Sequence, residues 1–243
     1  MSKIKYIIPF ILLPTSLMAQ ESPKNWSIGL VGMQSSGEYV NQNSNASILP
    51  YIRFESETIS IGMPDGITWR AYNHHDFEIN GFIKPRFHGL SDSNLLDRDL
   101  TGDLGISLKY DLVRGTSIKS SIQREVTGEH DGFELDASIS QFIPPIVGVP
   151  IIASAGIKWM DDNLSNYMYG VGSSDIGSGF ATYNTDDNFI PYVSLTSFYS
   201  VTDDVSLFGT FNYKMLSNEI IDSPLVKDDV DSYNIIIGLG YSF

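Results

Sequence analysis

Strict alternation of side-chain character is the feature that most constrains the fold of this chain. In the last eleven residues, YNIIIGLGYSF, one parity carries Tyr233, Ile235, Ile237, Leu239, Tyr241 and Phe243. The other parity carries mainly small or polar residues. A period of two places successive side chains on opposite faces of a β-strand. The segment therefore predicts a strand with two unlike faces, a pattern used by both soluble sandwiches and membrane barrels.

The same alternation recurs along the chain and predicts twelve strands. The expected ranges are 25–33, 46–55, 57–62, 66–72, 76–88, 101–113, 116–128, 132–143, 150–160, 188–200, 204–216 and 231–243. Only the sequence PDG at 64–66 separates the third strand from the fourth. If PDG is a bulge instead of a turn, the count changes, and ten strands is the alternative.

The first nineteen residues have the pattern of a secretory signal peptide. Lys3 and Lys5 precede the apolar run YIIPFILLP, and SLMA supplies small residues for cleavage after Ala19. The apolar run is too short to span a bilayer. We therefore expect residues 1–19 to be a signal peptide and residues 20–243 to form a single β domain. This exported chain contains no cysteine, so disulfides do not hold it together.

Three further features favour a transmembrane barrel over a sandwich. The strands are about ten residues long, as a tilted membrane crossing requires. Aromatic residues gather near the strand ends, as they do at membrane interfaces. Tight turns such as ESET and SVTDD alternate with longer polar loops at 34–45, 89–100, 160–187 and 217–230. The fold class predicted is thus an all-β, antiparallel outer-membrane barrel with short periplasmic turns and longer extracellular loops.

Charge is unevenly distributed over this predicted barrel. The formal net charge of −14 argues against nucleic acid as a partner. Most acidic residues fall in the loops, where they keep exposed segments solvated or, alternatively, bind divalent cations shared with lipopolysaccharide phosphates. The predicted lumen carries the bases Arg53, Arg70, Lys84, Arg86, Lys109, Lys119, Lys158 and Lys214 and the acids Glu78, Asp111, Glu125, Glu134 and Asp136.

A narrow lumen desolvates charges, so we expect many of these groups to pair. The candidate pairs join the four lysines at 109, 119, 158 and 214 to the acids at 125, 134 and 136. Such pairing predicts a rigid, closed barrel.

The aromatic end of the last strand is a candidate assembly signal. Tyr241 and Phe243 lie on the apolar parity, and a terminal aromatic residue resembles the signal by which bacterial barrel-assembly machinery recognises outer-membrane proteins. We therefore expect contact with that machinery and with the lipid and lipopolysaccharide of the bacterial outer membrane.

The C-terminal part carries a distinctive order of motifs. KWMDDNLSNYMYGV at 158–171 is followed by TYNTDDNFIPYVSLTSFYSVTDDVSLFGTFNYKML at 182–216 and SNEIIDSPLV at 217–226. This order resembles the MipA/OmpV family of outer-membrane proteins, densely over residues 150–243 and more loosely upstream. The resemblance implies a scaffold in the cell envelope that links a lytic transglycosylase to a murein synthase during peptidoglycan remodelling.

Residue patterns for other chemistry are not found. The sequence has no nucleophile elbow, zinc-protease helix motif, phosphate-binding glycine loop or cysteine cluster, so we expect no enzyme activity, cofactor or metal. Two functions remain. One is the interaction protein that the resemblance implies, and the other is a small-solute pore or uptake channel. Eight lumen bases against five acids would make such a channel mildly favourable to anions.

Overall fold

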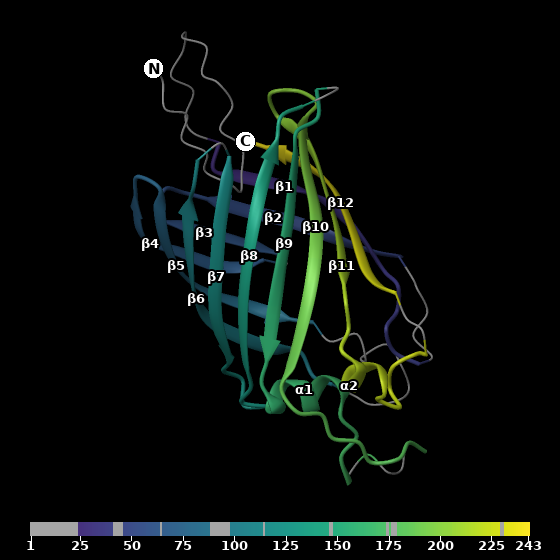
Figure 1. Cartoon of the computed structure of the whole chain (residues 1–243). Coiled ribbons are helices and arrows are strands. Elements are labelled where there is room, and N and C mark those ends of the chain that lie inside the picture. The colour runs from purple at the N-terminus through teal and green to yellow at the C-terminus, as the bar shows by residue number, and fades with distance from the viewer. Residues whose placement is uncertain are drawn as a thin grey trace.

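The computed structural model describes residues 24–40, 46–63, 65–87, 98–113, 115–145, 148–173, 175, 179–228 and 231–243. Each strand pairs antiparallel with the next, and the first pairs with the last, which closes a twelve-stranded barrel (Figure 1). The strands are β1 Trp26–Ser35, β2 Ala46–Glu55, β3 Ile59–Met63, β4 Gly66–His74, β5 Phe77–Arg86, β6 Thr101–Asp111, β7 Thr116–Glu125, β8 Phe133–Ile143, β9 Ile151–Met160, β10 Asn188–Ser200, β11 Val205–Lys214 and β12 Ser232–Ser242. Twelve strands are therefore confirmed, and the PDG segment separates β3 from β4.

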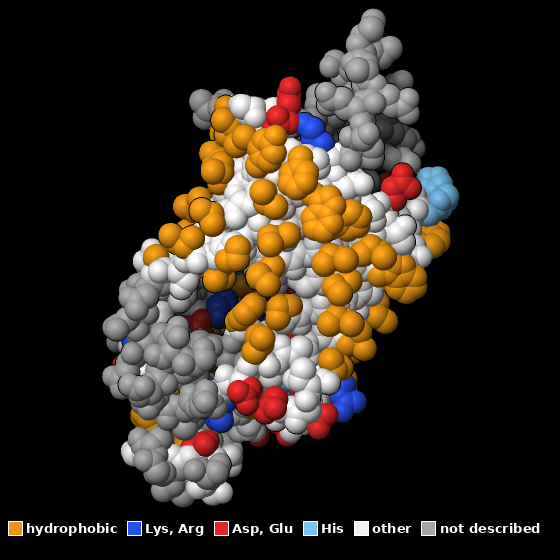
Figure 2. Space-filling view, turned by 180° about the vertical axis from the view of Figure 1, so that it is seen from behind, with side chains coloured by type: hydrophobic (Ala, Val, Ile, Leu, Met, Phe, Trp, Pro, Cys, Tyr) orange, Lys and Arg blue, Asp and Glu red, His pale blue; other side chains and the backbone are white. Residues whose placement is uncertain are grey.

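The two faces of the wall differ as the alternation predicts. Outward positions carry exposed apolar side chains such as Leu104, Ile106 and Leu108 on β6, whereas inward positions of the same strand carry buried Asp103 and Ser107. On the face seen in Figure 2, apolar side chains form a band between charged ends. Apolar-out and polar-in is the arrangement of a membrane barrel, because lipid contacts the outer wall.

The two ends of the barrel are also unlike. The start of β1 and the end of β12 lie at the same end as the tight turns, and α1 Asp162–Tyr169 and α2 Asn218–Ile221 lie at the other end (Figure 1). Even strand number and short turns place these two strand ends on the periplasmic side, and the loops therefore face outward. The predicted signal peptide lies outside the described residues.

The wall has one register change and one short strand. The register of β4 against β5 shifts between Arg70 and Tyr72, which is a β-bulge that the alternation did not predict. Only four residue pairs join β2 to β3, from Ile52 with Met63 to Glu55 with Ser60. The wall is therefore lower at β3 and β4 than elsewhere.

An apolar cluster lies at the outer mouth of the barrel. Its buried members are Tyr39, Met160, Leu164, Tyr169, Val171, Ile190, Ile220, Leu225 and Val226. They come from the loops β1–β2, β9–β10 and β11–β12 and from adjoining strand ends, and we call this cluster the plug.

No helix in the described part of the chain, α1 and α2 included, is long and apolar enough to cross a membrane.

A fourth loop, between β5 and β6, also contacts the loops at the outer mouth. Arg98, from the β5–β6 loop, donates to the carbonyl of Gly170 at 3.2 Å, lies 3.6 Å from the carboxylate of Asp175, and stacks over the ring of Tyr167. The β1–β2, β5–β6 and β9–β10 loops are each four strands apart in the ring of twelve. The β9–β10 loop therefore contacts loops on two other sides of the ring, which brings described loop residues over part of the outer mouth.

One carboxylate fastens the plug to the wall. Glu38, in the β1–β2 loop, pairs with Lys214 on β11 and accepts hydrogen bonds from Ser232 and, at 3.4 Å, from the hydroxyl of Tyr169. Burial raises the pKa of the Glu38 carboxyl, but the Lys214 charge and the three hydrogen bonds together outweigh burial. The pKa of Glu38 therefore lies below its ordinary value of 4.5.

A depressed pKa makes plug stability depend on pH in one direction. The contribution of Glu38 is fully present above pH 4.5, the ordinary carboxyl value, and is lost as pH falls through the lower folded value. Hydrogen exchange in residues 36–40 and 161–173, corrected for intrinsic rates, should stay slow from pH 7 to pH 5 and rise in stronger acid. Glu38→Gln should exchange faster at neutral pH and lose the acid-dependent rise. Glu129→Gln, at an exposed turn, is the control, and an unchanged acid response in Glu38→Gln would contradict the assignment.

Candidate functional site

The lumen of the outer half of the barrel holds a connected set of charges. Arg86 on β5 lies 2.8 Å from Asp103 on β6 and 2.8 Å from Glu134 on β8. Gln123 on β7 donates to the same two carboxylates at 3.3 and 2.9 Å, and Lys158 on β9 lies 3.2 Å from Glu134. We call these five residues the lumen network. It joins five neighbouring strands across the barrel interior.

A second charged group lies behind the low wall at β3. Arg53 on β2 pairs with Glu55 at 2.6 Å and with Asp65, in the β3–β4 turn, at 3.2 Å. Arg70 on β4 also pairs with Glu55. The two predicted bases therefore share one carboxylate.

The expected partners of the lysines are only partly correct. The structure places Lys158 beside Glu134 as expected. Lys109 instead pairs with Asp111 two residues along its own strand, at 2.8 Å, and Lys214 pairs with Glu38 in the β1–β2 loop. Lys119 makes no ion pair with any described residue and lies directly opposite Lys109 in the register of β6 and β7.

The remaining predicted acids serve local structure. Glu125 ends β7 and accepts hydrogen bonds from the backbone amides of Gly128 at 2.8 Å and Asp131 at 3.0 Å. Asp136 accepts from the hydroxyl of Tyr192 at 3.0 Å, and Glu78 accepts from Asn80 at 2.6 Å. Glu125 does not reach a lysine because the turn that follows β7 supplies closer donors.

The alternation did not identify the acids that pair with half of the eight predicted lumen bases. Glu38, Glu55, Asp65 and Asp103 all pair with predicted lumen bases. Extending the alternation of β6 back by two residues from Gly105 would have placed Asp103 on the lumen side. With these four acids counted, the excess of base in the predicted lumen disappears.

Aromatic side chains fill much of the remaining lumen. The ring of Tyr192 covers Gly156 of β9, where an added Cβ would lie 2.5 Å from the ring, and the ring of Phe82 similarly covers Gly105. Tyr51 and Phe208 meet with ring centroids 5.2 Å apart. Inward glycines therefore leave the space that aromatic rings from neighbouring strands occupy.

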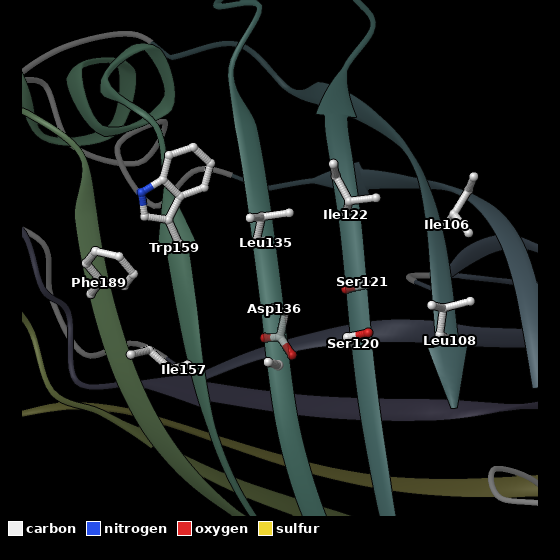
Figure 3. A pocket seen from close by; sticks show the side chains of 11 residues that line it. Ile106, Leu108, Ser120, Ser121, Ile122, Leu135, Asp136, Ile157, Trp159 and Phe189 are labelled. Atoms are coloured by element: carbon white, nitrogen blue, oxygen red, sulfur yellow. The ribbon is translucent and has the colours of Figure 1, made fainter. Parts of the chain in front are cut away.

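Two hollows lie outside this filled region. One, of about 150 Å³, opens at the periplasmic end and includes Lys24, Tyr51, Arg53 and Asp204 in its lining. The other, of about 580 Å³, lies on the outer wall, where Ile106, Ile122 and Leu135 form a row across three strands beside Trp159 and Phe189 (Figure 3). Because the apolar side chains of this hollow are exposed on the lipid side, it suits acyl chains and not a soluble substrate.

The predicted assembly residues lie on the outer wall at the periplasmic end. Tyr241 and Phe243 are exposed, and their rings stack with centroids 6.2 Å apart. The amide of Phe243 donates to the carbonyl of Trp26 at 2.9 Å. The terminal residue therefore also belongs to the β1–β12 seam.

The lumen network gives a stability prediction. Glu134 is 5% exposed and Arg86 is 14% exposed, so Glu134→Ala leaves a buried guanidinium with one carboxylate fewer. Loss of one partner from a buried pair costs about 3–5 kcal/mol. Lys158 is 35% exposed, so Lys158→Ala should cost only about 0–1 kcal/mol. Urea unfolding of the refolded barrel in micelles measures both changes, and equal losses would show that the network is hydrated throughout.

Comparison with known proteins places this architecture in a family. The family model described as MltA-interacting protein MipA matches residues 28–243. The chain is 26% identical over 245 residues to the Escherichia coli K12 protein named "Putative outer membrane protein YiaT", covering 98% of each chain. It is 25% identical over 252 residues to the "MltA-interacting protein" of the same strain, covering 100% of each. OmpV of Vibrio cholerae is 24% identical over 147 residues, which are 60% of this chain and 56% of OmpV.

Among solved structures, the NanC porin shares the fold, with a TM-score of 0.52 and 8% identity over 89% of this chain and 100% of NanC. The YiaT relative is named as an outer-membrane protein, and the match to the MipA family model covers nearly all of the described barrel. This protein is an outer-membrane barrel that belongs to the MipA/OmpV family.

Proposed function

We propose that this barrel is a non-catalytic interaction protein of the cell envelope, whose periplasmic rim binds a lytic transglycosylase and, through it, a murein synthase. Loop contacts at the outer mouth carry the proposal, because the β9–β10 loop packs with the β1–β2 loop in the plug and also binds Arg98 of the β5–β6 loop. Loops that narrow the outer mouth leave the periplasmic rim as the surface for an envelope partner. The name of the relative that interacts with MltA supports the choice of partner.

The periplasmic turns offer apolar contacts for such a partner. Val113 in the β6–β7 turn is 79% exposed, and Val201 in the β10–β11 turn is 50% exposed. Val149 in the β8–β9 turn is also exposed. These three valines lie on three successive periplasmic turns. Together they give the rim an apolar binding surface even though the turns are short. Lipopolysaccharide around the loops and the barrel-assembly machinery are the further partners of this proposal, with residues 1–19 as the export signal.

A small-solute channel is the second candidate. Lys119 and the periplasmic hollow are the observations that favour it, because an unpaired lumen base and an open inner end would attract a small anion. In that case the plug must move to open the outer mouth.

Two measurements on the full barrel separate these functions. The unmutated protein should capture a lytic transglycosylase from periplasmic extract and show little steady conductance in a planar bilayer. Val113→Asp combined with Val201→Asp should lose capture, whereas Ile237→Ala on the lipid face should not. Leu225→Asp, at a fully buried plug position, should raise conductance. Steady conductance without mutation, and capture that survives both rim changes, would favour the channel.

The assembly role of the terminal aromatic is also a proposal, supported by its place on the seam. Phe243→Ala or deletion of Phe243 should reduce the folded fraction more than Ser242→Ala does, because only Phe243 presents a ring to lipid. Heat-modifiable gel mobility of membrane fractions measures the folded fraction. Equal yields from the three variants would exclude a signal at this position.

A further inference from the structure

A window interrupts the wall of the barrel between β2 and β5. The β3–β4 hairpin ends at the turn around Asp65, so the residues of β2 before Ile52 have no partner on that side in the described chain. On the other side, β4 pairing ends at Ile67 with Ile83, and residues 84–86 of β5 likewise lack a β4 partner. Three strand spacings separate β2 from β5, so the window is about 14 Å wide.

Both edges of the window carry a proline at a position that would otherwise leave a free donor. The Glu55 amide donates toward β1, to the Asn25 carbonyl, and successive amides of a strand alternate in direction. Position 50 therefore points into the window, and Pro50 has no N–H there. On β5, Asp76 accepts from the Asp111 amide of β6, so the same alternation directs position 85 into the window. Pro85 again removes the donor.

Two edge prolines facing one gap indicate that the gap belongs to the native fold. An open sheet edge inside hydrocarbon leaves costly unpaired amides, and irregular backbone is tolerated there only where it is buried in protein or lines a water-filled cavity. Gly66 lies at the periplasmic edge of the window. It has a φ of +82°, and an added Cβ would lie 2.2 Å from the carbonyl oxygen of Ile83, so this position requires glycine. Figure 2 shows a hollow on the side of the barrel formed by the first strands, with basic and acidic side chains visible inside it.

The rim and the interior of the window differ in chemistry. Ile48, Met63, Ile83 and Phe87 are exposed around it on the lipid side. Lys84 lies on the window edge of β5, on the lumen parity beside Pro85, with its ammonium 5.4 Å from the ring centre of Phe82. Lys84 makes no ion pair within the described residues.

The charges around Lys84 sum to one positive charge. Arg86 and Lys158 are matched by Asp103 and Glu134 in the lumen network, and Lys84 interacts electrostatically with all four. Three bases and two acids leave a site that an anion would neutralise. The apolar rim next to it would hold a hydrocarbon chain.

We propose that the window is a binding site for a single-chain amphiphile with an anionic head group, of the fatty-acid class. The head group contacts Lys84 inside the lumen and the tail passes between Pro50 and Pro85 into the outer half of the bilayer. The window opens through the wall at the outer ends of β2 and β5, so it gives a ligand dissolved in the membrane a sideways route to the lumen. This site is independent of the proposed periplasmic partner.

Photo-crosslinking tests the site on the full barrel in nanodiscs. The probe is a palmitic acid analogue with a diazirine near its carboxylate, and mass spectrometry locates the adducts. Adducts should concentrate on residues 48–53, 65–67 and 82–87. Lys84→Gln should lower their yield about tenfold, the loss expected for one charged hydrogen bond. Lys119→Gln, at a lumen base away from the window, is the matched control and should leave the yield unchanged.

Probe chemistry and folding controls make each outcome decisive. The same analogue with an alcohol head group should give the low yield of Lys84→Gln. Both variants must show the heat-modifiable mobility of the unmutated barrel and must still capture the periplasmic partner, so failure here is distinguishable from failure of the proposed function. Adducts spread over the outer wall, including Trp159 and Phe189, would overturn the proposal. So would equal labelling by a diazirine phospholipid, which would assign the window to diacyl lipid.

Discussion

In hydrocarbon, a peptide group without a hydrogen-bond partner costs several kcal/mol, and the rest of this structure depends on meeting that requirement. The seam between β1 and β12 does so for the two end strands, with register from Ser27 opposite Ser242 to Ser35 opposite Asn234. The amides of Trp26 and Phe243 also donate to each other's carbonyls, at 3.3 and 2.9 Å. Closure therefore extends to the last residue of the chain.

Once the barrel is closed, its interior must be filled or hydrated. This chain fills it unevenly. The plug and the lumen network occupy the outer half, and rings seated on glycines narrow the lumen further. The periplasmic half keeps an opening, together with Lys119, which has no counter-ion among the described residues. The inside of the barrel thus changes from a packed end to an accessible end along its axis.

Much of the fold follows from the sequence because a membrane barrel repeats one simple pattern. Period-two alternation gave all twelve strands, with ends within a few residues of the observed ones. The alternation also indicated whether each charged side chain points into the lumen. It did not indicate the position of that side chain along the barrel axis. Glu134 meets Arg86, 48 residues earlier, only because strand stagger brings β5 and β8 to one level.

Other parts of the candidate site had no comparable signal. Glu38 lies in a loop, where side chains follow no regular period. The sequence therefore does not indicate that Glu38 pairs with Lys214, which lies 176 residues later in the chain. The inward glycines are visible in the sequence, but the rings that cover them come from neighbouring strands. The bulge after Arg70 depends on pairing with β5 and cannot be read from β4 alone.

The two edge prolines have a consequence for contacts between molecules. An exposed sheet edge normally invites strand addition, in which another chain extends the sheet through its main-chain amides and carbonyls. At the gap between β2 and β5, Pro50 and Pro85 each remove a donor that such an incoming strand would need. The barrel can therefore keep a break in its wall in a crowded membrane without offering a template for edge-to-edge aggregation.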